Sequence, residues 1–146
     1  MHRIHILLVE DNPADVRLVR EAIRKGKYNN ELHVATDGEM AMDFLFKRDK
    51  YLHAPTPGLI LLDLNLPLMN GREVLAEIKN HAVLRRIPVC VLTTSGEDRD
   101  ITDSYDLHAN SFIVKPIDHK QFTQVIHEIE SFWLSIVTLP GEKVLE

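Results

Sequence analysis

Five short apolar runs recur along this chain, and stretches with helical spacing of apolar residues lie between them. The runs occupy residues 4–9, 32–36, 59–62, 89–92 and 112–114. Runs of this length, bounded by turn residues, are typical of strands that are buried on both faces. Strands that alternate with helices predict βαβ units, and therefore a parallel sheet with helices on both faces.

The stretches between the runs, and the one after the last run, carry signals for five helices. These helices are expected after Asn12, after Asp37, after Asn70, from about Glu97 to His108, and after Asp118. Pro13 at the first helical position and Gly26 at the end support the first helix. Apolar spacing extends the third helix to Ala82 and the fifth to Val137, which makes the fifth about 30 Å long.

Five strands and five helices in this order fit an α/β, flavodoxin-like (βα)5 fold. This doubly wound parallel sheet has the strand order 2-1-3-4-5, so its first and third strands are neighbours. Residues 1–135 are expected to form one domain that includes an extended C-terminal helix. Residues 136–146 are expected to form a C-terminal extension.

Polar side chains follow four of the predicted strands at the point where each strand ends. Glu10 and Asp11 follow the first, Asp63 the third, Thr93 the fourth and Lys115 the fifth. The carboxyl ends of parallel strands share one edge of the sheet, which is where such sheets bind their ligands. We therefore expect these five residues in one crevice.

Three carboxylates in one crevice predict a bound cation. Like charges about 4 Å apart repel by roughly 4 kcal/mol at an effective dielectric of 20, and one lysine cannot neutralise three acids. Ligands that are all oxygen favour Mg2+ over zinc. Asp63 would then be a nucleophile for a phosphoryl group, with Lys115 and Mg2+ neutralising its oxygens and Thr93 donating a hydrogen bond.

This constellation resembles the receiver domain of a two-component response regulator. The residues that carry the resemblance are Glu10-Asp11, Asp63, Thr93, Phe112 and Lys115-Pro116. The resemblance extends from residue 3 to about residue 132. Within the family, the chain is most similar to the small receivers that serve cyanobacterial phytochrome histidine kinases. That narrower match rests on the long loop before Asp63, on residues 63–67 and on residues 131–135.

The resemblance implies a role for each of these residues. Asp63 would be the phosphoacceptor, and Asp11, Asp63 and the Asn65 carbonyl would bind Mg2+, with Glu10 acting through water. Thr93 and Phe112 would be the switch pair, and the Lys115–Pro116 peptide would be cis. Two positions depart from the common pattern, because Phe112 stands where Tyr is frequent and Glu10 where Asp is frequent.

Composition and charge restrict the possible partners and the compartment. The net charge of -5 among 146 residues argues against a nucleic-acid partner. No apolar run reaches the roughly 18 residues of a membrane helix, and a single cysteine, Cys90, fits a reducing cytoplasm. The eight histidines show no metal-ligand spacing and are interpreted as surface or packing residues.

An apolar stripe near the C-terminus predicts a homodimer. Phe132, Trp133, Leu134 and Ile136 continue the stripe of the last helix beyond the length that a small sheet needs for cover. A patch this apolar is expected to bury itself in a second copy of the chain. The alternative is that the stripe packs on the chain's own sheet.

The function expected from these observations is that of a stand-alone response regulator, not an enzyme. A histidine kinase, of the phytochrome type, would phosphorylate Asp63 and drive a conformational switch, while the downstream partner stays unknown. A metal-dependent phosphatase is an alternative, although it would use an acid where Asn65 stands. A pseudo-receiver that binds without being phosphorylated is the other alternative.

Overall fold

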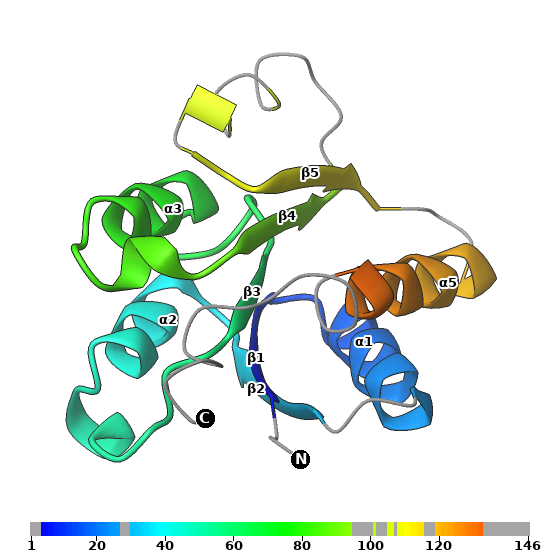
Figure 1. Cartoon of the computed structure of the whole chain (residues 1–146), viewed down its shortest axis with the longest axis horizontal. Coiled ribbons are helices and arrows are strands. Elements are labelled where there is room, and N and C mark those ends of the chain that lie inside the picture. The colour runs from blue at the N-terminus through cyan, green and yellow to red at the C-terminus, as the bar shows by residue number, and fades with distance from the viewer. Residues whose placement is uncertain are drawn as a thin grey trace.

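The computed structural model describes residues 4–26, 30–94, 101, 105–106, 108–115 and 119–132. Within them, five parallel strands form one sheet in the order β2-β1-β3-β4-β5 (Figure 1). The strands are β1 (Ile4–Val9), β2 (Asn30–Ala35), β3 (Leu59–Leu62), β4 (Val89–Thr93) and β5 (Ser111–Val114). The expected strand order is confirmed.

Helices cover both faces of this sheet, as a doubly wound fold requires (Figure 1). They are α1 (Pro13–Lys25), α2 (Gly38–Leu45), α3 (Gly71–Lys79) and α5 (His119–Glu130), with short 3-10 helices η1 (Asp49–Tyr51) and η2 (Leu84–Arg86). α1 and α5 lie on one face, and α2 and α3 lie on the other. None of the helices in the described part of the chain is both long and apolar enough to cross a membrane.

Successive residues of the central strands belong to two hydrophobic layers, one on each face of the sheet. Leu7 and Ile60 belong to the layer beneath α2 and α3, whereas Leu8 and Leu61 belong to the layer beneath α1 and α5. All four residues of β3 are at most 1% exposed, which explains their unbroken apolar run. Burial of each such side chain contributes roughly 1.5–3 kcal/mol, so packing on both faces stabilises the middle of the sheet.

Helix caps predicted from the sequence form as expected in the described part of the chain. The Asn12 side chain accepts hydrogen bonds from the N–H groups of Ala14 and Asp15, at 2.9 and 3.2 Å. Asp37 caps α2 in the same way, through the Met40 N–H at 2.7 Å. These caps fix where the chain turns after β1 and β2.

The expected third helix was too long. α3 ends at Lys79, so Ala82 lies in a turn outside it. The physical reason is His81, whose Nδ1 accepts hydrogen bonds from the N–H groups of Val83 and Leu84, both at 3.1 Å. Those two bonds satisfy the backbone locally and start η2 in place of another helical turn.

Two further expectations fall largely outside the described residues. Of the expected fourth helix, residues 101, 105–106 and 108 are described. Residues 101 and 105–106 are helical, but His108 lies in a turn with a φ of 68°, so the helix does not extend to His108 as expected. α5 ends at Glu130 and a turn of π-helix follows at 131–132, so the continuation to Val137 lies outside the described residues.

Candidate functional site

The strand ladder extends into the residues that carry the site. The Glu10 N–H donates to the Ala35 carbonyl at 2.9 Å, and the Asp63 N–H donates to the Val9 carbonyl at 3.0 Å. The Lys115 N–H donates to the Thr93 carbonyl at 2.7 Å. Sheet hydrogen bonds therefore hold the backbone of Glu10, Asp63 and Lys115 at the carboxyl edge.

Three carboxylates meet at this edge, as the sequence predicts. The acidic cluster consists of Glu10, Asp11 and Asp63, with one oxygen from each residue lying within 4.8 Å of the others. Glu10 and Asp63 are 2% and 6% exposed, whereas Asp11 is exposed to solvent. The cluster thus combines two buried carboxylates with one that faces water.

Lys115 is the cation that these buried acids share. Its Nζ contacts Glu10, lies 2.8 Å from Asp15 Oδ2 and lies 3.4 Å from Asp63 Oδ2. Asp15, in the first turn of α1, was missed at the sequence level, where its position is typical of an acid near a helix N-terminus. One lysine therefore serves three acids, and Asp11 adds a fourth carboxylate beside them.

The electrostatics of the edge follow from burial. Desolvation by burial raises the pKa of Glu10 to about 7. The hydrogen bond from Lys115 opposes this rise, and the negative charge of Asp63 adds to it. Burial alone would lower the pKa of Lys115, but hydrogen bonds to Asp15 and Glu10 outweigh it and raise that pKa. The edge therefore has more negative charge than one ammonium can balance.

This donor set fits a hydrated divalent cation. Glu10, Asp11 and Asp63 offer only oxygen atoms, which are the ligands of hard cations such as Mg2+ and Mn2+. Asp11 is exposed, so water can reach the cluster and complete the coordination of an ion that keeps several waters. A cation would also supply the positive charge that this edge lacks.

Asn65 links the acidic cluster to β4. Its backbone N–H donates to Asp63 Oδ1 at 3.2 Å, and its side-chain amide lies 3.5 Å from the Thr93 hydroxyl oxygen. Thr93 is fully buried at the end of β4. The structure thus places Asp63, Asn65 and Thr93 side by side, as expected.

The turn after β3 needs a glycine, which the sequence analysis did not anticipate. A Cβ atom at Gly71 would lie 2.2 Å from the Asp63 carbonyl oxygen, closer than any side chain can approach. The Gly71 N–H also donates to the Leu64 carbonyl at 2.9 Å. The first residue of α3 therefore packs directly against the backbone of Asp63.

Phe112 is separated from the acidic cluster by β4. It is half-buried on β5, opposite Val91 of β4, and packs against the hydrophobic layer of α2 and α3. The expected cis peptide after Lys115 involves Pro116, which lies outside the described residues.

This chain is similar to known proteins over most of its length. The sequence model of one protein family, the response regulator receiver domain, matches residues 6–127. The chain belongs to this family. It is 51% identical over 136 residues to response regulator Rcp1 of Synechocystis sp., an alignment that covers 93% of this chain and 92% of Rcp1. It is 38% identical to the probable methanogenesis regulatory protein FilR2 of Methanothrix harundinacea, over 93% of this chain and 87% of FilR2.

Solved structures place the chain more narrowly within the response regulators. The phosphorylated cyanobacterial phytochrome response regulator RcpA superposes with a TM-score of 0.93 at 49% identity, over 96% of this chain and 100% of RcpA. The Mn2+-bound form of Rcp1 gives 0.91 at 50% identity, over 94% and 99%. The expected resemblance to cyanobacterial phytochrome regulators is confirmed. This chain is a response regulator, of a family in which phosphorylation drives a conformational switch.

Proposed function

We propose that Asp63 accepts a phosphoryl group from a sensor histidine kinase of the phytochrome class. The observation that carries this proposal is the meeting of Glu10, Asp11 and Asp63 within 4.8 Å, with Lys115 Nζ 3.4 Å from Asp63. The similarity to a phosphorylated phytochrome regulator supports both the acceptor role and the class of kinase. A kinase that uses ATP would place the reaction in the cytoplasm.

Mg2+ is the proposed metal. Glu10, Asp11, Asp63 and the backbone carbonyl of Asn65 would hold it, and the Mn2+-bound form of Rcp1 supports a divalent ion in this family. When bound, Mg2+ supplies charge that neutralises the acids and the phosphoryl oxygens.

The protein's own side chains would carry the transfer. A carboxylate oxygen of Asp63 attacks phosphorus, and the bond from phosphorus to the kinase imidazole nitrogen breaks, its electron pair leaving with the imidazole. Lys115 Nζ, which lies 2.8 Å from Asp15 Oδ2, would donate hydrogen bonds to the phosphoryl oxygens and neutralise their negative charge. The buried Thr93 hydroxyl would donate to another of these oxygens.

Transfer of the phosphoryl group to Asp63 would also change the positions of the switch pair, Thr93 and Phe112. We propose that the Thr93 hydroxyl shifts toward the phosphoryl group and that the Phe112 ring turns inward behind it. Phe112 is only half-buried, so its ring has surface left to bury. The output would be a changed surface around β5 and α5 that a downstream protein reads.

A signalling role is favoured over turnover of phosphate esters. A phosphatase of this kind would use an acid two residues after the nucleophile, but Asn65 stands there and its amide faces Thr93 at 3.5 Å. An amide cannot deliver the proton that an ester leaving group needs. We expect no turnover of a model phosphate ester.

We further propose that residues 1–135 form the receiver domain and that residues 136–146 form a C-terminal extension. This extension and the end of α5 would together form a homodimer interface. Phe132 is 50% exposed and borders a cavity of about 690 Å³ that Ile113, Val125 and Ile129 also line. Trp133, Leu134 and Ile136 lie outside the described residues, and their apolar character comes from the sequence. A chain truncated after Ser131 should sediment as a monomer. If the truncated chain keeps the oligomeric state of the full chain, this interface is excluded.

The acceptor role is tested by intact mass after incubation with acetyl phosphate. The wild-type protein should gain one phosphoryl group with Mg2+ and none with a chelator, and Asp63→Asn should gain none. Asp49→Asn is the matched control, because Asp49 is an exposed acid whose φ of 51° an asparagine tolerates. Full labelling of Asp63→Asn would contradict the assignment.

A further inference from the structure

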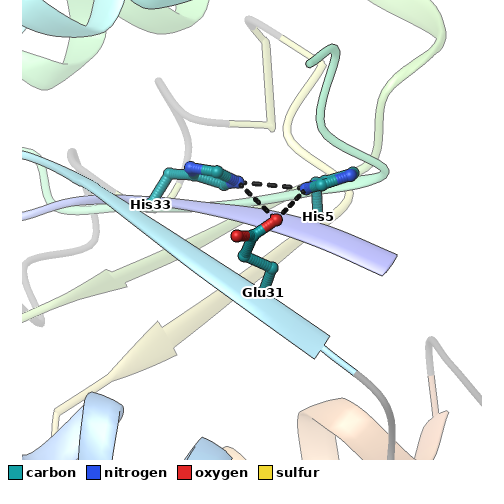
Figure 2. Close-up of side chains that lie close together, drawn as sticks. All are labelled: His5, Glu31 and His33. Atoms are coloured by element: carbon teal, nitrogen blue, oxygen red, sulfur yellow. Dashed lines mark hydrogen bonds and ion pairs between the residues drawn. The ribbon is translucent and has the colours of Figure 1, made fainter. Parts of the chain in front are cut away.

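A second cluster of possible metal ligands lies on β1 and β2, and Figure 2 shows its three side chains turned toward one another. The histidine cluster consists of His5, Glu31 and His33. His5 Nδ1 lies 3.0 Å from His33 Nε2 and 3.1 Å from Glu31 Oε2, and His33 Nε2 lies 3.8 Å from the same oxygen. The two histidines thus share a partner, Glu31, that the spacing of the sequence did not indicate.

Strand register brings these residues together. His5 pairs with Glu31, and His33 stands opposite Leu7, so all three side chains project from the same face of the sheet. This cluster is distinct from the acidic cluster, because Glu10 lies about 16 Å beyond His5 along an extended chain. It lies on the edge strand β2 and its neighbour, on the face that α2 covers.

The spacing of the three ligand atoms fits a small tetrahedral ion. Bonds of about 2.0–2.1 Å to zinc place neighbouring ligand atoms about 3.3 Å apart in a tetrahedron. The observed separations of 3.0, 3.1 and 3.8 Å are close to that value. Two imidazoles and one carboxylate form a known zinc donor set, which leaves a fourth position for water. Mg2+ and Ca2+ avoid such nitrogen ligands.

Neighbouring aromatic rings hold the cluster in place. The His33 ring packs against Phe44 of α2 with centroids 5.1 Å apart, and Phe44 packs in turn against Tyr51 at 5.4 Å. The His5, Glu31 and His33 side chains are 28%, 43% and 21% exposed, so an ion can reach them from solvent. Burial lowers the pKa of His33, which is consistent with a neutral ring that offers a lone pair.

We propose that His5 Nδ1, Glu31 Oε2 and His33 Nε2 form a zinc site that joins edge strand β2 to β1. When the ion binds, His5 Nδ1 and His33 Nε2 each offer it a lone pair, so a hydrogen on either nitrogen moves to the other nitrogen of that ring or to solvent. Because the site exists only when β1 and β2 are paired, zinc binds the folded chain and stabilises it. The competing explanation is a polar cluster that only packs.

Zinc titration in the presence of saturating Mg2+ separates the two explanations. The wild-type chain should bind one equivalent of ZnCl2, and Asp63→Asn should bind it equally well. His5→Gln and Glu31→Gln should each weaken zinc binding by about tenfold or more, whereas His53→Gln, at an exposed histidine outside the cluster, should not. Equal affinity in the cluster variants, or loss of binding in Asp63→Asn, would overturn the proposal.

A measurement on the unmodified protein covers the case in which a variant fails to fold. In nitrogen-15 NMR of the histidine rings, zinc should shift the ring nitrogens of His5 and His33 and leave those of His53 unchanged. Shifts confined to other histidines, or none at one equivalent of zinc, would refute the site.

Discussion

The two ends of β1 carry two ion-binding arrangements of opposite chemistry. Beyond its carboxyl end, Glu10 joins Asp11 and Asp63 in an all-oxygen cluster beside the buried ammonium of Lys115. Near its amino end, His5 joins Glu31 and His33 across to β2. The first arrangement has more carboxylates than its one ammonium can neutralise, whereas the second combines one carboxylate with two imidazole rings that offer nitrogen ligands.

The donor atoms of the two clusters explain how one sheet can bind two different ions at separate sites. The acidic cluster selects a hard, hydrated ion because it offers oxygen atoms and one solvent-facing acid. The histidine cluster selects a softer ion because nitrogen dominates its donors. The two sites share a strand but no ligand, so each can be removed without touching the other.

The largest effect is expected from removing the lysine of the acidic cluster. Lys115→Ala should slow phosphorylation by acetyl phosphate by about a hundredfold or more, because the ammonium that neutralises the phosphoryl oxygens is lost. Stopped-flow or timed intact-mass assays would measure this rate. Lys25→Ala, at a lysine that is 67% exposed on α1, should change nothing. A Lys115→Ala rate within threefold of wild type would contradict the role of this residue.

A crossed metal experiment would test whether the acidic cluster and the histidine cluster bind their ions independently. Mg2+ at about 100 times its dissociation constant should stabilise the wild-type chain by about 2.7 kcal/mol in thermal melts. Asp11→Asn should lose most of this stabilisation while keeping that of zinc, and His5→Gln should behave in the opposite way. Loss of both effects in either variant would mean that the two sites are not independent.

Glu130 supplies a third case, a buried carboxylate held by an amide. Its Oε2 accepts a 2.6 Å hydrogen bond from the Asn30 amide, and burial raises the pKa of Glu130 to about 7. Because the folded pKa exceeds the unfolded value of 4.5, its contribution to stability is full at low pH. That contribution is lost as the pH rises through 7.

Glu130→Gln should therefore remove this pH dependence. Relative to wild type, the variant should gain about 3 kcal/mol of stability between pH 4 and pH 8, because a rise in pKa from 4.5 to about 7 corresponds to about 1.36 kcal/mol per pKa unit. Urea melts at both pH values would measure the difference. A constant gap between the two proteins would show that Glu130 does not titrate in this range.

The smallest effect is expected at Asp15. Asp15→Asn removes a partly exposed ion pair of 2.8 Å with Lys115, which is worth about 1 kcal/mol. The lysine keeps its other two carboxylates, so the phosphorylation rate should change by only about fivefold. A loss as large as that of Lys115→Ala would mean that Asp15 alone positions the ammonium.

Topology explains why the acidic cluster could be predicted from the sequence. Glu10, Asp63, Thr93 and Lys115 each follow an apolar run, and a parallel sheet gathers the carboxyl ends of its strands. The order of elements therefore sufficed to bring these residues together, without any knowledge of side-chain directions.

The missed features depend on geometry that the order of elements does not carry. His5 and His33 meet only because the β1–β2 register offsets them by one pleat. Asp15 reaches Lys115, 100 residues away, through the orientation of α1. Gly71 is required by a backbone contact with Asp63, and the sequence alone presents it as an ordinary residue after a helix cap.

The most direct test of the central claim locates the phosphoryl group chemically. Borohydride reduction converts an aspartyl phosphate into homoserine, which peptide mass spectrometry can assign to one position. After phosphorylation with a histidine kinase and Mg2+, homoserine is expected at position 63 alone, and none when Mg2+ is chelated. Homoserine at position 11 or elsewhere, with Asp63 unchanged, would contradict the assignment of Asp63 as the acceptor.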